Sequence, residues 1–292
     1  MEMMLELQGV GKQYKEFALQ DVTVSLPKGY IMGYIGRNGA GKTTTINLIN
    51  RICNPSEGTI RVNGITYGED PIRYKEQIGF IGDESYFPKE MRIKDIRSIL
   101  KHSYQSFDEK EFNQMIKNWK LPEKQKIEKF SRGMKVKLMF ACTLCRETKL
   151  LILDEATNGL DPVMREEVLE LLQDYIASGE RSILFSTHML NDLEQIADYI
   201  VFIEDGKIIL NDTKDDILES YVKIKGKKED LSQVLRERMI GISTKDYGFE
   251  GLLSTENADL LSKKYVIEKP NIDQIMVHML REKKGGHAYE GI

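Results

Sequence analysis

The chain has 292 residues, of which 41% are hydrophobic and 30% are charged, and its formal net charge at pH 7 is −4. This composition is ordinary for a soluble globular protein, and the length suits one or two domains. A net negative charge gives no electrostatic reason to expect a nucleic acid as partner, because such partners are bound through clustered positive charge.

The chain opens with predicted strands. The segments "MLELQGVGKQY" and "ALQDVTVSLPKGYIMGYIG" have strand-like patterns separated by turn glycines. The opening "MEMMLELQGV" is acidic and alternating, which is typical of a strand and not of a signal peptide. No apolar run approaches the ~18 residues that a transmembrane helix needs, so we expect no membrane-spanning helix.

The stretch Gly36–Thr43 matches the phosphate-binding pattern G-x-x-x-x-G-K-[ST] between an apolar strand and the predicted helix "TTTINLINR". Glycines let successive backbone N–H groups turn toward phosphate oxygens, and the helix N-terminus adds the positive end of its dipole. We expect Lys42 to reach the β- and γ-phosphates and Thr43 to ligate Mg²⁺. The other residues predicted to bind the nucleotide here are Gly36, Asn38, Gly39, Ala40, Gly41 and Thr44.

The middle of the chain is predicted to be mostly helical. After the short strand "GTIRVNG", residues from about 93 to 120 have helical periodicity, and a polar break leads to the helix "MKVKLMFACTLCRE". We therefore expect an inserted α-helical subdomain at about 85–150. Cys142 and Cys145 form a C-x-x-C in this last helix. Because the chain has no second such pair, buried core residues are favoured over a metal or redox site.

The continuous apolar run "LLILDEA" predicts a buried parallel strand that ends at Asp154. Downstream of a phosphate loop, such an acid is expected near Mg²⁺, as in the Walker-B motif. Glu155, the next residue, is placed to orient or deprotonate an attacking water. A GTPase would need the guanine-reading pattern N-K-x-D, which this sequence lacks.

The last third continues with the helix "VMREEVLELLQDYIASG", the strand "RSILFSTH", the helix "LNDLEQIA" and a hairpin turning at Asp205-Gly206. After about Tyr221 a strand, a helix, two strands and a final helix are predicted, the last with an Asn cap and a Gln at its third position. The basic segment "KIKGKKED" is expected to be a solvated face. We expect an α/β domain at 1–217, a small C-terminal α+β domain at 218–284 and a flexible tail at 285–292.

The order of these motifs resembles the nucleotide-binding domain of an ATP-binding cassette (ABC) transporter, over about residues 2–215. "FSRGMKVKL" resembles the family's signature segment, usually L-S-G-G-Q, and matches it at Ser131 and Gly133. The resemblance implies a phosphate-loop, RecA-like α/β core with an antiparallel β subdomain and the inserted helical subdomain. A plain helix N-cap is an alternative role for Ser131, and both roles can hold together.

Three further residues match motifs of that family. "ATNGLDP" resembles the D-loop, with Asp161 at its acidic position, and "STHML" resembles the switch loop, with its histidine at His188. Tyr14 sits where the family stacks an aromatic ring on adenine. A strand aromatic and a structural histidine are the alternatives for Tyr14 and His188. The resemblance assigns catalytic roles to Glu155, His188 and Lys42, and metal contacts to Thr43, Asp154 and Asp83.

The sequence departs from the family pattern at two places. The family usually has Gln after "IGF", where this chain has Asp83 followed by Glu84. An Asp can ligate Mg²⁺ but cannot donate a hydrogen bond to water as Gln can, so we expect Asp83 to couple the site to its partner with altered Mg²⁺ dependence. Arg132 and Met134 replace Gly and Gln of the signature, while Ser131 and Gly133 are kept.

The resemblance also implies partners. Two subunits of the family enclose two ATP molecules head to tail, with Ser131 and Gly133 of one facing the γ-phosphate held by Lys42 of the other. A separate transmembrane permease would dock at about Asp83–Lys94, where Tyr86 and Phe87 are candidate contacts or local packing residues. The chain would then act at the cytoplasmic face of the membrane, and the second subunit could be identical or different.

The signature and the C-terminal helix look similar to Gram-positive exporters of antimicrobial peptides, drugs or membrane components. Two other classes remain open at this point. One is a cytosolic cassette ATPase of translation or DNA repair, which would carry a second cassette or a long coiled coil. The other is a regulatory module that holds ATP without turnover, against which Glu155 and His188 argue.

Overall fold

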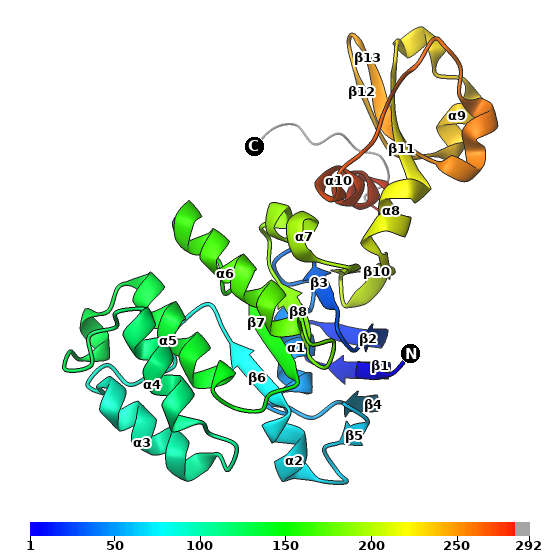
Figure 1. Cartoon of the computed structure of the whole chain (residues 1–292). Coiled ribbons are helices and arrows are strands. Elements are labelled where there is room, and N and C mark those ends of the chain that lie inside the picture. Colours follow the sequence, from blue (N-terminus) through cyan, green and yellow to red (C-terminus); the bar gives the residue numbers. More distant parts are fainter. Residues whose placement is uncertain (284–292) are drawn as a thin grey trace. The chain divides into compact units, whose positions relative to one another are not determined.

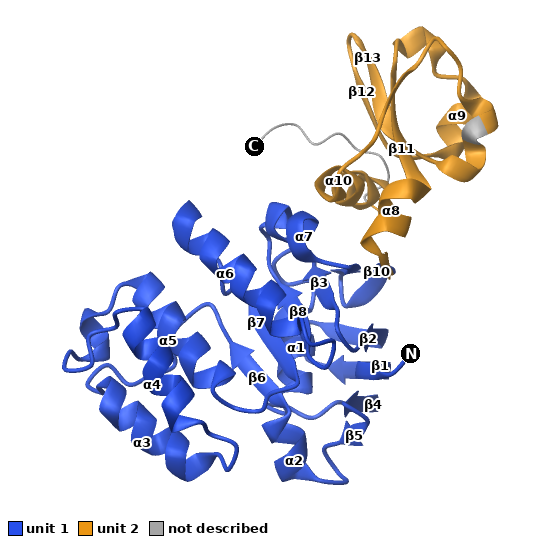
Figure 2. Cartoon of the chain, in the orientation of Figure 1, with its two compact units in different colours: residues 1–211 blue, residues 212–292 orange. Residues whose placement is uncertain are grey.

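The computed structural model describes residues 1–283, except the side chain at position 258. The chain divides into two compact units, residues 1–211 and residues 212–292 (Figure 2). The boundary expected from the sequence, 217/218, falls inside helix α8 (Lys214–Ser220). Thr213 caps this helix, which runs directly into strand β11 (Tyr221–Gly226) and contacts it, so α8 is part of the second unit. The predicted tail lies outside the described residues.

A six-stranded sheet forms the centre of the first unit, in the order β10-β9-β3-β8-β7-β6 (Figure 1). The pairings from β9 to β6 are parallel. Every residue of β3 and β8 is buried, as expected for continuous apolar runs in a parallel sheet covered on both faces. The strands are β3 (Ile31–Ile35), β6 (Ile78–Ile81), β7 (Leu150–Asp154), β8 (Ser182–Ser186), β9 (Tyr199–Glu204) and β10 (Lys207–Thr213).

A second sheet of the first unit is antiparallel, in the order β2-β1-β4-β5. One hydrophobic cluster joins it to helix α1 (Lys42–Ile49) and to the central sheet, through residues such as Val10, Ile46 and Ile152, all fully buried. This is the antiparallel subdomain that the sequence resemblance predicts. Its strands are β1 (Met3–Gln13), β2 (Ala18–Pro27), β4 (Glu57–Val62) and β5 (Ile65–Thr66).

The predicted helical subdomain consists of α3 (Ile93–Ser103), α4 (Glu109–Asn118), the short 3-10 helix η1 (Ile127–Lys129) and α5 (Arg132–Leu144). These helices lie together at one side of the unit (Figure 1) and share their own hydrophobic cluster. Cys142 and Cys145 belong to that cluster and are 3% and 1% exposed. Burial raises the pKa of Cys145 to about 12, which favours a neutral core thiol. No group of three or more potential metal-binding side chains occurs within residues 1–283.

The remaining helices of the first unit are α2 (Pro71–Glu76), α6 (Pro162–Ile176) and α7 (Leu190–Ile196). The sequence analysis missed α2, which is six residues long and starts after the Asp70 cap and a proline at its first position. It also assigned no element to residues 78–81, which form β6. With α3 to α5, β6 and the two sheets in place, the fold class predicted from the sequence is confirmed.

The second unit has a four-stranded antiparallel sheet in the order β12-β13-β11-β14. The sequence analysis missed β12 (Met239–Lys245), because its polar C-terminal half and Gly241 weaken the strand pattern. The predicted Asn cap is confirmed: Asn271 Oδ1 accepts from Gln274 N at 2.9 Å, and Gln274 Oε1 accepts from Asn271 N at 3.3 Å. The other elements are α9 (Gln233–Arg238), β13 (Gly248–Ser254), β14 (Val266–Glu268), α10 (Ile272–Lys283) and the 3-10 helices η2 (Lys228–Asp230) and η3 (Thr255–Leu260).

The search for a bilayer-spanning segment gave a negative result. Over the described part of the chain, no helix combines the length and the apolar character that crossing a membrane requires.

Candidate functional site

The phosphate loop joins the carboxyl end of β3 to α1. Its backbone turns at Gly39 and Gly41, whose φ angles of 83° and 118° lie in the left-handed region. Lys42 is 6% exposed, and its Nζ donates to the carbonyl oxygens of Gly36 at 2.7 Å and Arg37 at 3.3 Å. The ammonium group therefore lies inside the curve of the loop, where phosphate oxygens are expected to bind.

Contacts around the loop connect it to Tyr14. A Cβ on Gly36 would lie 2.3 Å from the Ile203 carbonyl oxygen, so this position needs glycine. A Cβ on Gly41 would lie 3.1 Å from the ring of Phe17, whose centroid is 6.5 Å from that of Tyr14. Tyr14 lies in the turn between β1 and β2, not within a strand, and is 41% exposed. An exposed ring beside the loop suits stacking on a base.

The other residues predicted to bind the nucleotide follow the course of the loop. Asn38 and Gly39 are exposed at its tip, whereas Gly36 is half-buried and Ala40 is buried. Thr44 is half-buried on the first turn of α1, next to the exposed Thr43.

Thr43 meets the acid at the end of β7. Its Oγ1 donates to Asp154 Oδ2 at 3.2 Å, a bond between residues 111 positions apart. The other carboxylate oxygen, Oδ1, is buried and makes no hydrogen bond of normal geometry within residues 1–283; Oγ of Ser186 on the neighbouring β8 is also buried and interacts with this carboxylate. Burial raises the pKa of Asp154. A buried carboxylate with one unmet oxygen is an arrangement that a cation would stabilise.

Glu155 and His188 are in direct contact. Nδ1 of His188 lies 2.5 Å from Glu155 Oε2, and the His188 backbone N–H donates to the same oxygen at 3.3 Å. The Glu155 backbone has a φ of 55°, and its N–H donates to the carbonyl of Ser186 at 2.8 Å. The Glu155 side chain is 19% exposed and that of His188 is 51% exposed. The histidine thus orients the glutamate at the carboxyl edge of the parallel sheet.

Two of the predicted residues cap helices. Ser131 Oγ accepts from the Met134 N–H at 3.2 Å at the start of α5, and Asp161 Oδ1 accepts from the Met164 N–H at 3.0 Å at the start of α6. Gly133 lies in the first turn of α5, and a Cβ at this position would be in ordinary contact with Met164 of α6 at 3.7 Å. The capping role considered for Ser131 is present, and it is compatible with anion binding at the same helix end.

The carboxylate of Asp83 contacts the guanidinium of Arg132. Arg132 Nε also donates to the carbonyl of Asn158 at 2.5 Å, in the segment between Glu155 and the α6 cap. No hydrogen bond within residues 1–283 joins Asp83 to Thr43 or to the acid at the end of β7. Of the three predicted metal residues, the structure therefore brings Thr43 and Asp154 together at the end of β7. Asp83 lies against the signature segment instead.

The chain is similar to known proteins over the region that holds these motifs. A family model described as "ABC transporter" matches residues 19–158. The ABC transporter ATP-binding protein YtrB of Bacillus subtilis is 33% identical over 239 residues, which cover 81% of this chain and 82% of that protein. This chain belongs to the ABC transporter ATP-binding family. As a member it binds ATP and is an ATPase.

A second ABC relative is similar in sequence, and a solved ABC structure is similar in fold. The lantibiotic transport ATP-binding protein SrtF of Streptococcus pyogenes is 34% identical over 210 residues, covering 71% of this chain and 90% of that protein. A solved structure of an ATP binding subunit of an ABC transporter superposes with a TM-score of 0.66 at 29% identity. That match covers 73% of this chain and 91% of the other.

Some residues of this ABC site were not singled out from the sequence. Ser186 lies beside the acid of β7, and Phe17 connects the turn that carries Tyr14 to the loop. Thr157 Oγ1 donates to Asp192 Oδ2 at 2.9 Å, a buried bond that ties the segment after Glu155 to α7. Ser186 and Asp192 lie close to His188 in the sequence, and this closeness does not reveal which side chains they meet.

Proposed function

We propose that this ABC ATPase powers the export of a peptide, drug or similar amphipathic cargo through a separate membrane permease, as one of two paired nucleotide-binding subunits. The observation that carries the ATPase part is the convergence of four side chains at one edge of the parallel sheet. The Thr43 hydroxyl is hydrogen-bonded to Asp154 at the end of β7. Glu155, which follows β7, is in contact with His188, which follows β8. A nucleotide, a metal ion and a water molecule could therefore be bound side by side at that edge.

The loop residues would hold the triphosphate. Lys42 would exchange its two carbonyl partners, Gly36 and Arg37, for the β- and γ-phosphate oxygens. The N–H groups from Asn38 to Thr44 would surround the phosphates, because the left-handed glycines and the start of α1 turn them inward. The exposed ring of Tyr14 would stack on adenine.

The residues at the end of β7 fit a magnesium ion. Thr43 offers a hydroxyl, and Asp154 has a buried oxygen that makes no hydrogen bond of normal geometry in the described chain. Oxygen ligands of this kind suit Mg²⁺, which usually binds through one or two protein groups, phosphates and water. When bound, the ion would neutralise charge on the phosphates. Asp83 would join this set only after leaving Arg132.

Glu155 would act on the attacking water. Its carboxylate is fixed by two contacts from His188, through the ring and through the backbone N–H. A glutamate held in this way can orient a water molecule and accept its proton as the water attacks the γ-phosphate. The half-exposed imidazole of His188 would keep that carboxylate in place and contact the γ-phosphate.

A second subunit would complete the site. Within residues 1–283, no hydrogen bond or ion pair joins Ser131 or Gly133 to the phosphate loop. The N-terminus of α5 is therefore free to meet the γ-phosphate of a partner, with Asp161 near the subunit boundary. ATP would favour the closed pair, and hydrolysis would remove that preference.

A groove of about 630 Å³ in the first unit is the proposed permease contact. It lies between the segment that follows β6 and the helical subdomain, and its lining includes Asp83, Phe87 and Arg132. Phe87 also packs on the helical cluster, and its ring is 4.7 Å from that of Tyr86, which is 54% exposed. Phe87 would serve both uses, whereas Tyr86 is not part of the lining of this groove and shares a second pocket with Cys142 and Thr143 of α5. Binding there would place the chain at the cytoplasmic face of the membrane.

The export direction and the cargo class are supported by SrtF, a relative named for lantibiotic transport, at 34% identity. ATP hydrolysis is common to the family and does not identify the cargo, which would contact the permease and not this chain. The cargo part of the proposal is therefore tested on the membrane complex and the ATPase part on this chain.

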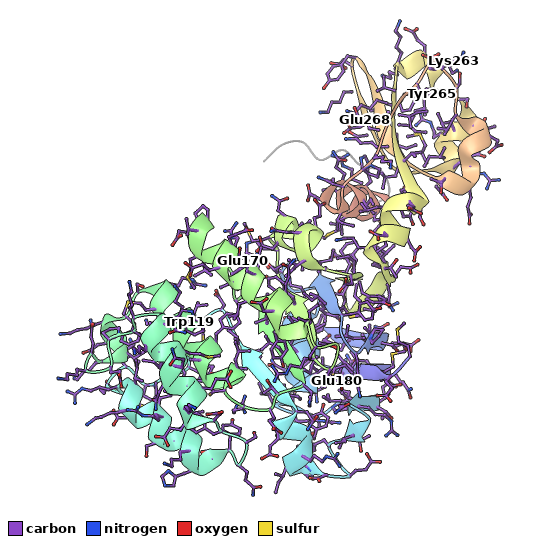
Figure 3. All side chains as sticks on the ribbon, viewed as in Figure 1. Trp119, Glu170, Glu180, Lys263, Tyr265 and Glu268 are labelled. Carbon is purple, nitrogen blue, oxygen red and sulfur yellow. The ribbon has the colours of Figure 1, made fainter. Side chains whose placement is uncertain are left out.

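The test measures ATPase rate against protein concentration for the wild type and Glu155→Gln, with dimerisation followed in the same samples by light scattering. We expect a rate that rises more than linearly with wild-type concentration. The variant should lose at least about 100-fold in rate, because the residue that orients the water is replaced, and form an ATP-dependent dimer. Glu180→Gln, in the exposed loop after α6 (Figure 3), is the matched control and should behave as wild type.

A linear rate with no ATP-dependent dimer of Glu155→Gln would contradict pairing between identical chains. Purification from native membranes then decides the partner. A multispanning membrane protein that co-purifies supports the transporter, and co-sedimentation with ribosomes instead would contradict it.

A further inference from the structure

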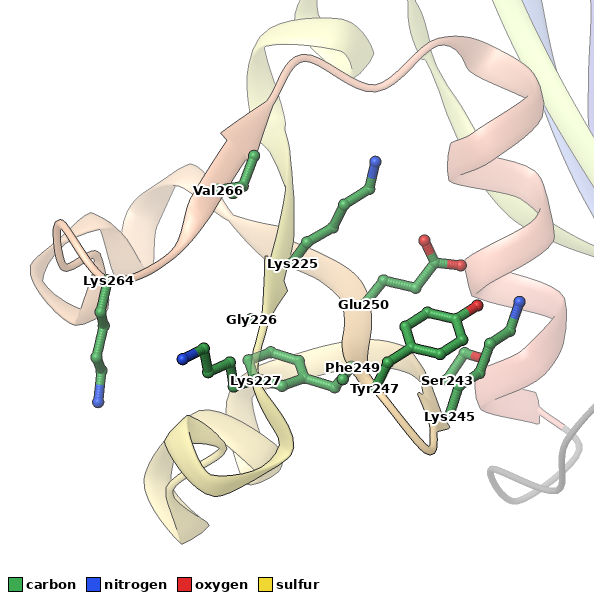
Figure 4. A pocket seen from close by; sticks show the side chains of 11 residues that line it. Lys225, Gly226, Lys227, Ser243, Lys245, Tyr247, Phe249, Glu250, Lys264 and Val266 are labelled. Atoms are coloured by element: carbon green, nitrogen blue, oxygen red, sulfur yellow. The ribbon is translucent and has the colours of Figure 1, made fainter.

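A cavity of about 410 Å³ in the second unit does not gather its charged side chains around one ligand (Figure 4). Lys227 and Phe249 point to one side of the sheet, and Lys245 and Tyr247 point to the other. Phe249 is also 4% exposed and belongs to the hydrophobic cluster of this unit. A buried polar pair in the first unit, by contrast, is close in sequence to both residues that are proposed to act on the attacking water.

Two segments that leave the central sheet are joined by three contacts. The Glu155 N–H donates to the Ser186 carbonyl at 2.8 Å, and the Glu155 carboxylate lies 2.5 Å from the ring of His188. In the third contact, Thr157 Oγ1 donates to Asp192 Oδ2 at 2.9 Å. The first two contacts involve the proposed catalytic pair itself. The third lies two residues beyond Glu155 in one segment and four residues beyond His188 in the other.

The Thr157–Asp192 contact is buried. Thr157 is 0% exposed and Asp192 is 3% exposed. Burial raises the pKa of the Asp192 carboxyl, and the hydrogen bond from Thr157 and the charge of the nearby Arg165 only partly oppose this effect. Valine and leucine, which branch as threonine and aspartate do, would fill the same space without the cost of burying polar groups. What the polar pair adds is direction, because a hydrogen bond depends on distance and angle.

The segment after β7 is a compact series of turns. The Asn158 N–H donates to the Glu155 carbonyl at 3.1 Å, and the Leu160 N–H donates to the Thr157 carbonyl at 3.3 Å. Glu155 has a φ of 55°, which a non-glycine residue keeps only where the surrounding contacts hold it. An anchor at Thr157 therefore restrains Glu155 on one side and the chain that leads to Asp161, the cap of α6, on the other.

The segment after β8 is equally compact. The Met189 N–H donates to Thr187 Oγ1 at 3.0 Å, and the Asp192 N–H donates to the Met189 carbonyl at 3.0 Å. Asp192 itself lies in the first turn of α7. Because His188 lies between Thr187 and Met189, its backbone cannot shift far while these bonds are kept. The buried bond to Asp192 therefore sets the spacing between the segment of Glu155 and the segment of His188.

We propose that Thr157 and Asp192 are positioning residues for ATP hydrolysis, whose hydrogen bond keeps the Glu155 carboxylate where it acts on the attacking water. This role rests on the proposed action of Glu155 and His188 on that water. Without the bond the catalytic pair could still form, but the segment that carries it could move away from the γ-phosphate. A shift of ~1 Å can cost as much as 100-fold in rate. No hydrogen bond within residues 1–283 joins Thr157 or Asp192 to the phosphate loop, so nucleotide binding should be kept.

The test removes both polar groups together in Thr157→Val/Asp192→Leu. Because no buried carboxylate is left without a donor, the thermal unfolding midpoint should stay within about 3 °C of wild type. The kcat for ATP should fall at least about tenfold while KM stays within about twofold, since the nucleotide still binds but the water is not held in place. Calorimetry and steady-state kinetics measure these, the latter at the protein concentration that gives the highest wild-type rate.

A conservative variant and a matched control separate positioning from packing. Thr157→Ser keeps the hydroxyl and should keep kcat within about twofold of wild type, although it removes a buried methyl group. The control is Thr148→Val/Tyr175→Phe, which removes another buried hydroxyl pair, at 3.1 Å, near the amino end of β7 and away from the site. It too should keep kcat within about twofold.

Hydrogen–deuterium exchange with ADP and Mg²⁺ bound measures the restraint without turnover. The amides of residues 155–160 should exchange at least about tenfold faster in Thr157→Val/Asp192→Leu than in wild type, and at the wild-type rate in the control. A wild-type kcat of Thr157→Val/Asp192→Leu overturns the proposal, and so does unchanged exchange of these amides. An equal loss of nucleotide affinity also overturns it, because the phosphate loop would then be disturbed. Full activity of Glu155→Gln together with faster exchange here would overturn the role of the glutamate and leave the restraint supported.

Discussion

At the scale of single residues, the two departures from the family pattern turn out to be one interaction. Asp83 stands where the family has glutamine, and Arg132 stands where the signature has glycine. Their side chains contact each other across 49 positions of sequence. Arg132 further holds the carbonyl of Asn158 at 2.5 Å. The pair thus links the loop after β6, the signature segment and the D-loop segment within one chain.

We expect Asp83→Gln and Arg132→Gly to be coupled in ATP hydrolysis. Each single variant leaves one charged partner alone beside the signature segment, whereas the double variant restores the family's residue types. The singles should lose about threefold in kcat/KM, and the double variant should recover most of that loss. This is a coupling of ~1 kcal/mol, the upper range for a partly exposed pair. Steady-state kinetics and Mg²⁺ titrations measure it.

The matched control for this cycle is Lys101→Ala/Glu109→Ala, which removes an exposed pair at 2.7 Å in the helical subdomain. Its effect on kcat/KM should be within about twofold. Strictly additive losses for Asp83→Gln and Arg132→Gly, or an unchanged rate and Mg²⁺ dependence for Asp83→Gln alone, would contradict a functional role of the pair.

Residue types and spacing predicted where the loop glycines, Lys42 and Asp154 belong, because a phosphate loop needs a fixed local pattern. They could not predict that Asp83 would contact Arg132, because a long-range ion pair leaves no periodicity in the sequence. The same holds for Ser186, whose only sequence feature is its place at the end of a strand. Contacts between distant segments depend on the order of the strands in the sheet, which the sequence motifs do not specify.

At the scale of elements, the start of α5 combines a cap with a proposed anion site. Ser131 Oγ accepts the Met134 N–H at 3.2 Å, and the 13-residue helix behind it packs eight buried residues into the cores of the unit. A helix end of this kind stabilises negative charge beside it, and in the proposed pair that charge would be the phosphate of a nucleotide held by the second subunit. The two roles can be separated by choice of substitution.

We expect Ser131→Ala to lower the free energy of unfolding by about 1 kcal/mol, the usual loss for an N-cap. Ser131→Asp should keep the cap, because aspartate caps as well as serine, yet its charge would repel a γ-phosphate. This variant should unfold within about 0.5 kcal/mol of wild type and lose at least about tenfold in ATPase rate. Urea unfolding and steady-state kinetics on the same preparations measure both quantities.

Asp108→Asn, at the cap of α4 in the helical subdomain, serves as a control, since asparagine also caps well; its stability and ATPase rate should match wild type. Full ATPase activity of Ser131→Asp, with its stability retained, would show that this helix end does not face a phosphate during turnover.

The predictability of elements followed the strength of their local signals. Helix α10 was found with its capping pair Asn271 and Gln274, because both partners lie within four residues. Strand β12 was missed, since its pairing with β13 and not its own pattern makes it a strand. Helix α2 has only six residues, too few for a periodic signal.

At the scale of the whole molecule, each unit has hydrophobic clusters of its own. The first unit buries residues of both sheets and of the helical subdomain in two clusters. The second unit has a smaller cluster that includes Ile224, Leu235 and Leu253, all at most 2% exposed. The motifs of the sequence fall in the first unit, so a ligand of the phosphate loop would stabilise that unit directly.

We therefore expect two thermal transitions, of which only one responds to nucleotide. At about 100 times its dissociation constant, a non-hydrolysable ATP analogue with Mg²⁺ should stabilise the first unit by ~2.7 kcal/mol. That is a shift of about 5–10 °C for a unit of this size. Ile224→Ala, a fully buried change in the second unit, should lower only the other transition, because it removes core contacts there. Calorimetry of both proteins, with and without analogue, separates the assignments. A single transition that moves as a whole with either change would mean that the two units unfold together.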